Sequence, residues 1–254
     1  MRRLARFHAV GAALFAAALL LLWQLLADRQ VISPVFFPSP SRTLAELYRQ
    51  MVQGDLWRPL EATAYRMFYG WVLASLAGVI LGAAIGFSRT ARDYLEPLLE
   101  FMRPLPASAV IPAAILFFGL SNTMTVAVIA FGAVWPVLLG SLHGFVSIEP
   151  QLADVSAALR LSRPQSFVKI AVPNALPDIL AGARVSLAIS LILAVVTEMQ
   201  ASQIGLGQNI LLAQRSFRSP ELYAGVVTLG IMGFAINHGI VLLERRLLRW
   251  RGSA

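Results

Sequence analysis

Side chains able to do covalent or acid–base chemistry are few in this chain and lie far apart in the sequence. The absence of cysteine excludes disulfides, thiolate metal sites and a cysteine nucleophile. The three histidines, His8, His143 and His238, form neither a metal pair nor a catalytic triad at recognisable spacing. Lys169 is the only lysine, and the residues before it lack the glycines of a Gly-x-x-x-x-Gly-Lys-Ser/Thr phosphate loop. The sequence therefore predicts no catalytic site, no metal site and no ATP binding of that kind.

Residues 150–178 form a long polar and basic stretch between two apolar runs. Four residues of this stretch have the spacing of one face of a short amphipathic helix: Leu152, Val155, Leu159 and Ser162. Pro164 suits the first turn of a second helix. Pro173 and Pro177 are expected to end that helix and begin a new element. The segment is thus predicted to be a helix–turn–helix at the membrane surface, facing the cytoplasm.

This segment resembles the EAA loop of ABC importer permeases. That motif reads Glu-Ala-Ala, three residues, Gly, nine residues, and Ile-x-Leu-Pro. Asp154-Val155-Ser156 stands for the first part, Arg160 for the glycine and Ile170-Ala171-Val172-Pro173 for the end. Because the glycine permits a sharp turn, Arg160 must either avoid a positive φ or bear strain.

Short motifs elsewhere resemble the nitrate, sulfonate and taurine branch of these permeases, so the resemblance covers nearly the whole chain. They are Phe37-Pro-Ser-Pro40, Gly54-Asp-Leu-Trp57, Arg103-Pro-Leu-Pro106, Gly182-Ala-Arg184, Glu198-Met199, Gly205-Leu-Gly207 and Leu243-Glu-Arg-Arg246. The resemblance implies an all-α membrane protein with the type I importer (MetI-like) fold and cytoplasmic coupling helices. It implies a path for a small anion such as a sulfonate, taurine, nitrate or a related organic acid.

The resemblance also implies partners. A second copy of the chain, two cytoplasmic ATPase subunits and a periplasmic solute-binding protein would complete the importer. ATP and magnesium would be bound by the ATPase, and this chain would need no cofactor. The residues implied to couple to the ATPase are Asp154, Val155, Ser156, Leu159, Arg160, Leu161, Ser162, Arg163, Phe167, Ile170 and Pro173.

Composition independently indicates an integral membrane protein. Apolar residues make up 57% of the 254 residues, charged residues only 13%, and the mean hydropathy is +0.70. Soluble domains contain about 25% charged residues. The net charge of +8 fits basic residues that flank spans on the cytoplasmic side, so nucleic-acid binding is not expected. No break in composition suggests a second domain, and residues 1–254 are taken as one permease domain.

Six apolar runs predict six membrane spans, and the resemblance implies that the membrane is the bacterial inner membrane. They cover residues 7–27, 66–88, 104–119, 123–144, 178–199 and 222–243. Most of the 21 lysines and arginines then lie in cytoplasmic segments if both termini are cytoplasmic. The first run is longer than the apolar part of a signal peptide and is expected to remain as a span. Residues 1–65 would be this span plus a periplasmic amphipathic segment with a Thr43–Glu46 capping box, and residues 66–245 the core spans.

The third and fifth spans are expected to face the subunit interface and line the path. The third contains Pro104, Pro106 and Pro112, and broken helices often line transport paths. The polar residues predicted to line the path are Ser108, Ser186, Ser190 and Glu198. Glu198, near the outer end of the fifth span, is either a functional carboxylate or a partly wet interface residue. Small residues recur every fourth position between Gly70 and Gly86, which favours close helix packing within the subunit over a dimer seam.

Three other functions compete with this interpretation. A secondary transporter should show inverted repeats and ionisable residues at mid-membrane, and neither is clear in the sequence. A membrane enzyme should show a cluster of catalytic side chains. A permease of the same family could instead carry another small organic compound, such as an aromatic carboxylate or a pyrimidine vitamin precursor.

Overall fold

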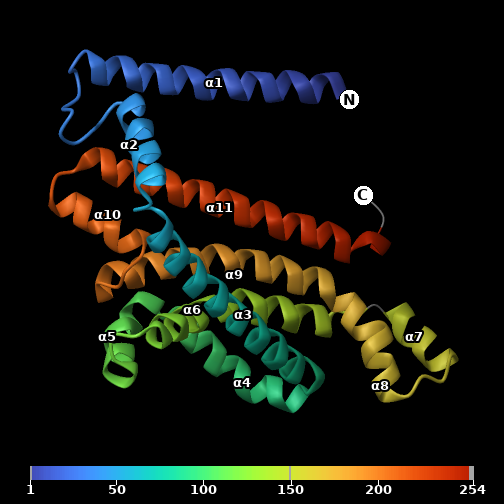
Figure 1. Ribbon diagram of the computed structural model, residues 1–254. Coiled ribbons are helices and arrows are strands. Elements are labelled where there is room, and N and C mark those ends of the chain that lie inside the picture. Colours follow the sequence, from blue (N-terminus) through green and yellow to red (C-terminus); the bar gives the residue numbers. More distant parts are fainter. Residues whose placement is uncertain (1, 149, 252–254) are drawn as a thin grey trace.

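The computed structural model describes residues 2–148 and 150–251, which contain helices and no strand, as the all-α prediction requires. Figure 1 shows their order. The elements are α1 (Arg2–Asp28), α2 (Pro40–Gln53), α3 (Trp57–Phe87), α4 (Arg89–Met102), α5 (Ala107–Phe118), α6 (Asn122–Val146), α7 (Pro150–Ala158), α8 (Arg163–Ser166), the π-helical turn η1 (Phe167–Ala171), α9 (Val172–Ala201), α10 (Leu206–Arg215), α11 (Ser219–Leu247) and the 3₁₀ turn η2 (Arg249–Arg251).

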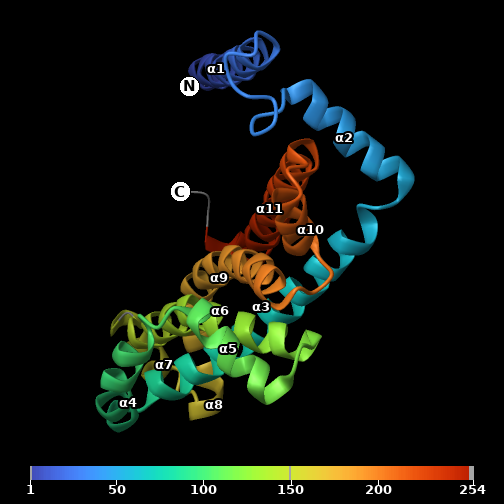
Figure 2. The same cartoon turned by 90° about the vertical axis from the view of Figure 1, so that its left-hand side faces the viewer.

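Three long helices, α3, α6 and α9, form the centre of the bundle, and α11 lies along α9 (Figures 1 and 2). Their facing side chains make one apolar core that includes Met67, Ile129, Val137, Leu187 and Leu193. At one end of the bundle α10 packs against α9 and α11, and at the other end α7 and α8 project. Most of the helix α1 lies apart from the bundle (Figure 2), and near its C-terminal end the ring of Trp23 lies 5.8 Å from that of Tyr223 on α11.

The stripe of small residues on α3 packs against α6 of the same chain. A Cβ atom placed on Gly78 would lie 2.8 Å from Cβ of Val137, and one on Gly82 would lie 2.8 Å from the carbonyl oxygen of Leu138. Both distances are too short for real Cβ contacts, so only glycine permits this approach of the two backbones. The prediction that the stripe serves packing within the subunit is confirmed.

The count of six spans stays a prediction. By length and composition, α3, α6, α9 with its preceding turn, and α11 can each cross a membrane. The predicted third span at 104–119 corresponds to α5, which has only 12 residues, about 18 Å, against about 30 Å of hydrocarbon, so it does not cross alone. Together α4 and α5, which are bent by 94°, make a fifth span if they cross as one unit. A span in α1, whose described apolar stretch is Leu14–Asp28, stays a prediction.

The helix α2 begins earlier than the sequence suggested. Ser39 caps it, with Oγ accepting a hydrogen bond from the backbone N–H of Arg42 at 3.4 Å, and the fixed φ of Pro40 suits the first turn. The predicted capping box at Thr43 is therefore wrong, because Thr43 is buried inside the helix. Glu46 instead accepts hydrogen bonds from the Arg49 guanidinium, which lower the pKa of its carboxyl group.

Pro173 lies in the first turn of a new element, α9, as predicted, but the backbone stays helical across this junction and Pro177 lies inside α9. Residues Arg163–Ala201 run as one helical segment from α8 through η1 into α9. The N–H of Val172 bonds to the carbonyl of Phe167 five residues earlier, which widens the turn just before Pro173. A wider turn makes room for the proline ring and avoids the hydrogen bond that Pro173 cannot donate. The fifth span therefore begins earlier than residue 178.

Candidate functional site

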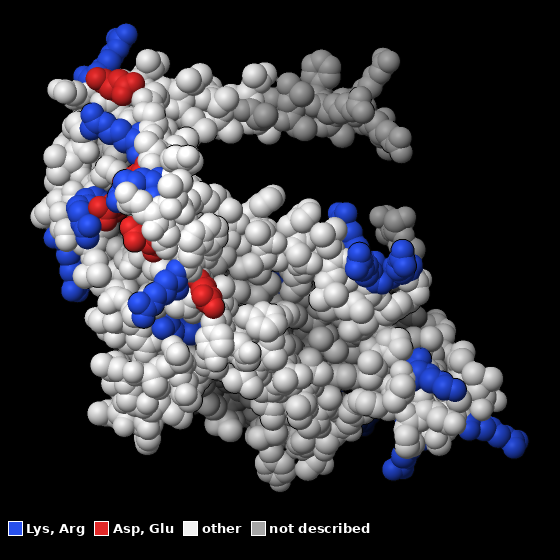
Figure 3. Space-filling view, viewed as in Figure 1, with Lys and Arg blue, Asp and Glu red and all other residues white. Residues whose placement is uncertain are grey.

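The predicted helix–turn–helix is present and projects from one end of the bundle as α7 and α8 (Figure 1). In the face shown in Figure 3, the charged side chains at this end are basic, whereas basic and acidic side chains mix at the opposite end. Arg160, Arg163 and Lys169 are the exposed cations of the projecting segment. The segment is thus a basic protrusion that the bundle does not cover.

The turn between the two helices places Arg160 in the left-handed region, with φ at +47°. The N–H of Leu161 bonds to the carbonyl of Ser156 at 3.1 Å, which is the 6→1 bond of a Schellman ending of α7. Glycine is the usual residue at this position because it lacks a Cβ atom. Arg160 therefore keeps the turn shape implied by the EAA loop and bears the strain that glycine would avoid.

Replacing Arg160 with glycine is expected to stabilise the protein. Removing the Cβ relieves about 1–2 kcal/mol of left-handed strain, and the added freedom of the unfolded chain reduces the gain to about 0.5–1 kcal/mol. Thermal unfolding of the purified protein measures the change, and Arg163→Gly, which replaces a residue in α8 without positive φ, should instead destabilise. Destabilisation by Arg160→Gly would show that the arginine side chain matters more than the turn.

Hydrogen bonds fix the second helix against the first. The backbone N–H of Ser162 donates to Oε1 of Gln165 at 3.0 Å, and Pro164 lies in the first turn of α8, as predicted. The hydroxyl of Ser156 donates to the hydroxyl of Ser166 at 3.0 Å and so joins α7 to α8. These contacts give the protrusion one defined shape, which a protein partner can recognise.

Apolar side chains stand exposed among the cations of the protrusion. Leu159 is 65% exposed and Val168 is 63% exposed, and Val155 is also exposed. Leu161 and Ile170 are half-buried, so they contribute less surface. The sequence did not single out Val168, although it lies next to Phe167 in the same segment. A partly apolar surface with a basic rim matches the usual composition of a protein–protein contact.

Phe167 connects the protrusion to the bundle. Its ring lies 5.2 Å from that of Phe87 at the end of α3 and 6.0 Å from that of Phe145 at the end of α6, measured between centroids. Asn174, about two turns further on, donates from Nδ2 to the carbonyl of Gly144 at 3.1 Å. The protrusion is therefore joined to three long helices by packed rings and a hydrogen bond. Phe167 makes this connection and is also 37% exposed.

A buried charged cluster lies at the opposite end of the bundle. The carboxylate of Glu198 on α9 is 0% exposed, and Nη1 of Arg66 on α3 lies 2.9 Å from its Oε1. The hydroxyl of Thr63 donates to Oε1 at 2.9 Å, and the backbone N–H of Gly207 donates to Oε2 at 3.0 Å. The charge of Glu198 is thus neutralised and hydrogen-bonded on both oxygens, as a buried carboxylate requires.

The same cluster fixes the segment that leads into α10. Arg66 also donates from Nη1 to the carbonyl of Ile204 at 2.7 Å and from Nε to Oδ1 of Asn122 at 2.8 Å. A Cβ atom on Gly205 would overlap the Glu198 carboxyl group, so the backbone can approach the carboxylate only with glycine there. The sequence identified Glu198 and the Gly205-Leu-Gly207 motif but missed Arg66 and Thr63. Thr63 and Arg66 are three residues apart and therefore lie on one face of a helix, which was the sequence feature that could have indicated them as a pair.

The polar residues predicted to line the path occupy mostly buried positions. Ser186 and Ser190 are fully buried on α9, where Ser186 donates to the carbonyl of Ala133 at 2.7 Å and Ser190 to that of Ser186 at 2.8 Å. Together with Glu198 they lie in the packing between helices of one subunit in this conformation. Ser108 on α5 is half-buried. Their exposure to a path stays a prediction.

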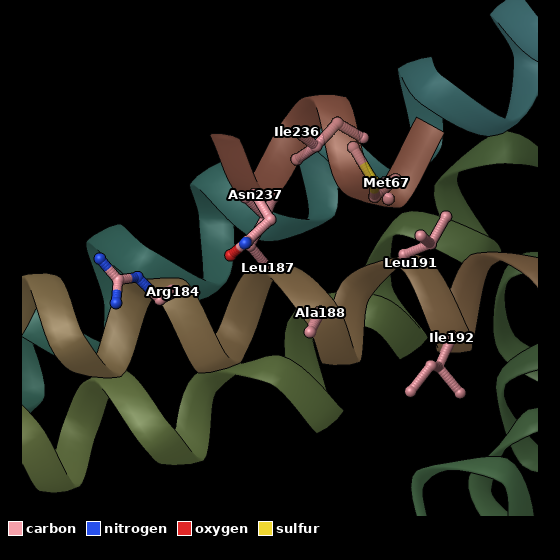
Figure 4. Close-up of a pocket in the computed structure, with 9 residues that line it drawn as sticks. Met67, Arg184, Leu187, Ala188, Leu191, Ile192, Ile236 and Asn237 are labelled. Atoms are coloured by element: carbon pink, nitrogen blue, oxygen red, sulfur yellow. The ribbon is translucent and has the colours of Figure 1, made fainter. Parts of the chain in front are cut away.

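The opposite face of α9 is uncovered and borders a pocket. Small and apolar side chains are exposed along it at Ala181, Val185, Ala188 and Ile192. Between α9 and α11 lies a pocket of about 230 Å³ whose lining includes Met67, Leu187 and Leu191 (Figure 4). Its polar side chains are Arg184 of α9 and Asn237 of α11.

Only some of the hydrogen-bond donors of Arg184 have a partner. It forms an ion pair through Nη2 with Glu244 on α11. Its Nε is buried and makes no hydrogen bond to any residue in the part of the chain that the structure describes. A buried N–H without an acceptor costs about 1–3 kcal/mol. The pocket is thus bordered by a cation whose side chain is 40% exposed, although its Nε is inaccessible.

Comparison with known proteins identifies relatives of this chain. Residues 74–251 match the family described as binding-protein-dependent transport system inner membrane component. A Bacillus subtilis (strain 168) permease named for aliphatic sulfonate transport, SsuC, is 32% identical over 94% of this chain and 87% of its own. The taurine transport system permease protein TauC of Escherichia coli (strain K12) is 32% identical over 93% of this chain and 88% of its own. The nitrate import permease protein NrtB of Synechocystis sp. (strain ATCC 27184 / PCC 6803 / Kazusa) is 28% identical over 90% and 85%.

Two solved structures show the same fold. A chain of the MetNI methionine ABC transporter in inward-facing conformations aligns with a TM-score of 0.58 over 75% of this chain and 93% of its own, at 19% identity. A chain of an amino acid ABC transporter crystallised with histidines aligns with a TM-score of 0.56 over 75% and 91%, at 16% identity. At these identities the likeness concerns the fold alone.

Proposed function

Because the chain belongs to the family of binding-protein-dependent transport system inner membrane components, we propose that two copies of it form the solute path of a bacterial importer. It is a permease subunit of an ATP-binding-cassette importer of the inner membrane, and ATP hydrolysis belongs to separate ATPase subunits. The proposal adds two ATPase subunits, which bind ATP and magnesium, and one periplasmic binding protein.

The observation that carries the proposal is the protrusion of α7 and α8. It presents Leu159 and Val168 to the surroundings and is tied through Phe167 to the ends of α3 and α6. An ATPase that binds there can bias the helices, because its contact is physically continuous with them. The coupling residues predicted from the EAA loop then divide into contact residues, such as Leu159, and connecting residues, such as Phe167.

We place α7 and α8 in the cytoplasm. Basic residues concentrate in cytoplasmic segments of membrane proteins, and the visible charges at the protruding end are basic (Figure 3). The buried Arg66–Glu198 cluster and α10 then face the periplasm, where a binding protein delivers solute. Both termini are cytoplasmic in this arrangement if α1 crosses the membrane.

The transported solute is proposed to be a small anion of the sulfonate, taurine or nitrate class. This rests on the names of the relatives, which concern aliphatic sulfonates, taurine and nitrate. We assign the path to the uncovered face of α9, which carries Ala181, Val185, Ala188 and Ile192, together with Ser108 on α5. In this conformation Ser186, Ser190 and Glu198 are separated from that face by the body of α9.

Reconstitution tests the proposal. The permease, its ATPase and its binding protein are expected to take up labelled taurine, ethanesulfonate or nitrate into proteoliposomes only when ATP is supplied on the ATPase side. The binding protein alone, titrated with the same solutes, should show the same order of preference. Uptake driven by an ion gradient without the ATPase would contradict the assignment and support a secondary transporter.

A further inference from the structure

We propose that the pocket between α9 and α11 is a binding subsite for the transported anion, with Arg184 and Asn237 as its polar partners. This subsite rests on the proposed function and is a specific place in the membrane subunit where the solute binds transiently. It gives the permease itself, in addition to the external binding protein, a preference for negative charge.

Charge is the first argument. Arg184 is partly exposed and pairs with Glu244 near the end of α11, and an arginine in a membrane-spanning helix typically faces a cavity or a functional partner. Arg184 lies 12 residues after the start of α9, about 18 Å along that helix, and it lines the pocket. Its guanidinium uses Nη2 for Glu244 and its Nε is inaccessible, but the side chain as a whole is 40% exposed. The accessible part of a guanidinium can donate charge-assisted hydrogen bonds to an oxyanion.

Shape and lining are the second argument. The volume of about 230 Å³ is below the roughly 300–1,000 Å³ of pockets for drug-sized ligands, so it suits a solute of a few heavy atoms. Asn237 points from α11 toward α9 and supplies an amide donor (Figure 4). Met67, Leu187 and Leu191 provide apolar contact for a short alkyl chain. A cation at one end and an apolar wall match a short alkanesulfonate better than a sugar or an amine.

Location is the third argument. The pocket opens beside the uncovered face of α9, where Ala188 and Ile192 belong to both. A solute moving along that face therefore meets Arg184 before the cytoplasmic end of the helix. Glu244 competes with the solute for the same guanidinium, which keeps the binding weak enough for release.

The test uses the purified permease–ATPase complex in nanodiscs, without the binding protein, and ligand-observed NMR titration with ethanesulfonate. Arg184→Gln is expected to weaken binding about tenfold or more, because the charge-assisted hydrogen bonds are lost. Glu244→Gln is expected to tighten binding severalfold, because it frees Arg184 and removes a negative charge. The uncharged dimethyl sulfone should bind weakly to all three proteins.

The two single variants are expected to change ethanesulfonate affinity in opposite directions, which distinguishes a ligand site from a purely structural ion pair. If the pair only joins α9 to α11, both single variants would lower thermal stability and neither would change ethanesulfonate affinity, which would overturn the proposal. Exchanging the charges, with Arg184→Glu and Glu244→Arg together, should retain assembly and lose ethanesulfonate binding. Equal binding of ethanesulfonate and dimethyl sulfone would identify an apolar cavity open to lipid and would also overturn it.

ATPase co-purification is measured for each variant in parallel. If wild-type affinity persists in Arg184→Gln while the ATPase stays bound, the subsite is wrong and the importer assignment stands. If the wild-type chain retains no ATPase at all, the importer assignment itself fails.

Discussion

Replacing Leu159 with aspartate is expected to separate the membrane subunit from its ATPase. Leu159 is 65% exposed just after α7 and is the most exposed large apolar side chain of the protrusion. Central apolar residues contribute most of the binding energy of such contacts, and a carboxylate buried without a partner opposes binding strongly. Co-purification should therefore fall to background, and solute-stimulated ATP hydrolysis should be lost.

Two control variants make this result specific. Arg163→Ala removes an exposed rim charge and should weaken the ATPase contact only modestly, because exposed charges contribute about 0–1 kcal/mol. Leu44→Asp introduces the same change on α2, where Leu44 is 59% exposed at the far side of the molecule, and should retain the ATPase. If the complex of Leu159→Asp keeps its ATPase and full coupling, the protrusion is not the docking site.

Replacing Arg66 with leucine is expected to destabilise the protein severely. Arg66 is 6% exposed and is the ion-pair partner of the fully buried Glu198. Removing one partner leaves a buried carboxylate without its charge partner, which costs about 3–5 kcal/mol. The loss also frees the carbonyl of Ile204, so the segment before α10 should become mobile. Unfolding of the purified protein in detergent, followed by heat or denaturant, measures the effect.

A neighbouring arginine provides the matched control. Arg58→Leu changes an exposed residue two turns earlier on α3 and should leave stability nearly unchanged. The double variant Arg66→Leu with Glu198→Leu should be more stable than Arg66→Leu alone, because no unpaired charge remains. If Arg66→Leu unfolds at the same temperature as wild type, the cluster does not stabilise the fold.

Local features of the protrusion were predictable from sequence because they depend on neighbouring residues. Pro164 marks the first turn of α8, and the recurrence of Leu152, Val155 and Leu159 marks α7. The packing role of Gly78 and Gly82 was also predictable, since a smooth helix face has few other uses.

Features set by distant residues were not predictable in the same way. Glu198 was recognised as significant, but its partner Arg66 lies on another helix, and no local pattern joins the two. Pro173 was expected to end a helix because the sequence does not reveal the widened turn that accommodates it. Ser186 and Ser190 were chosen as path residues for their polarity, whereas their neighbours in space place them on the buried face of α9.

A single introduced thiol tests the central claim most directly, because the chain contains no cysteine. Leu159→Cys, labelled with a benzophenone maleimide and illuminated in the assembled complex, should cross-link to the ATPase. Leu44→Cys, treated identically, should not. A shift in the yield of the Leu159 product on adding ATP would follow from a contact that differs between two states. Absence of this product in a complex that still couples ATP hydrolysis to transport would contradict the assignment of α7 and α8 as the ATPase contact.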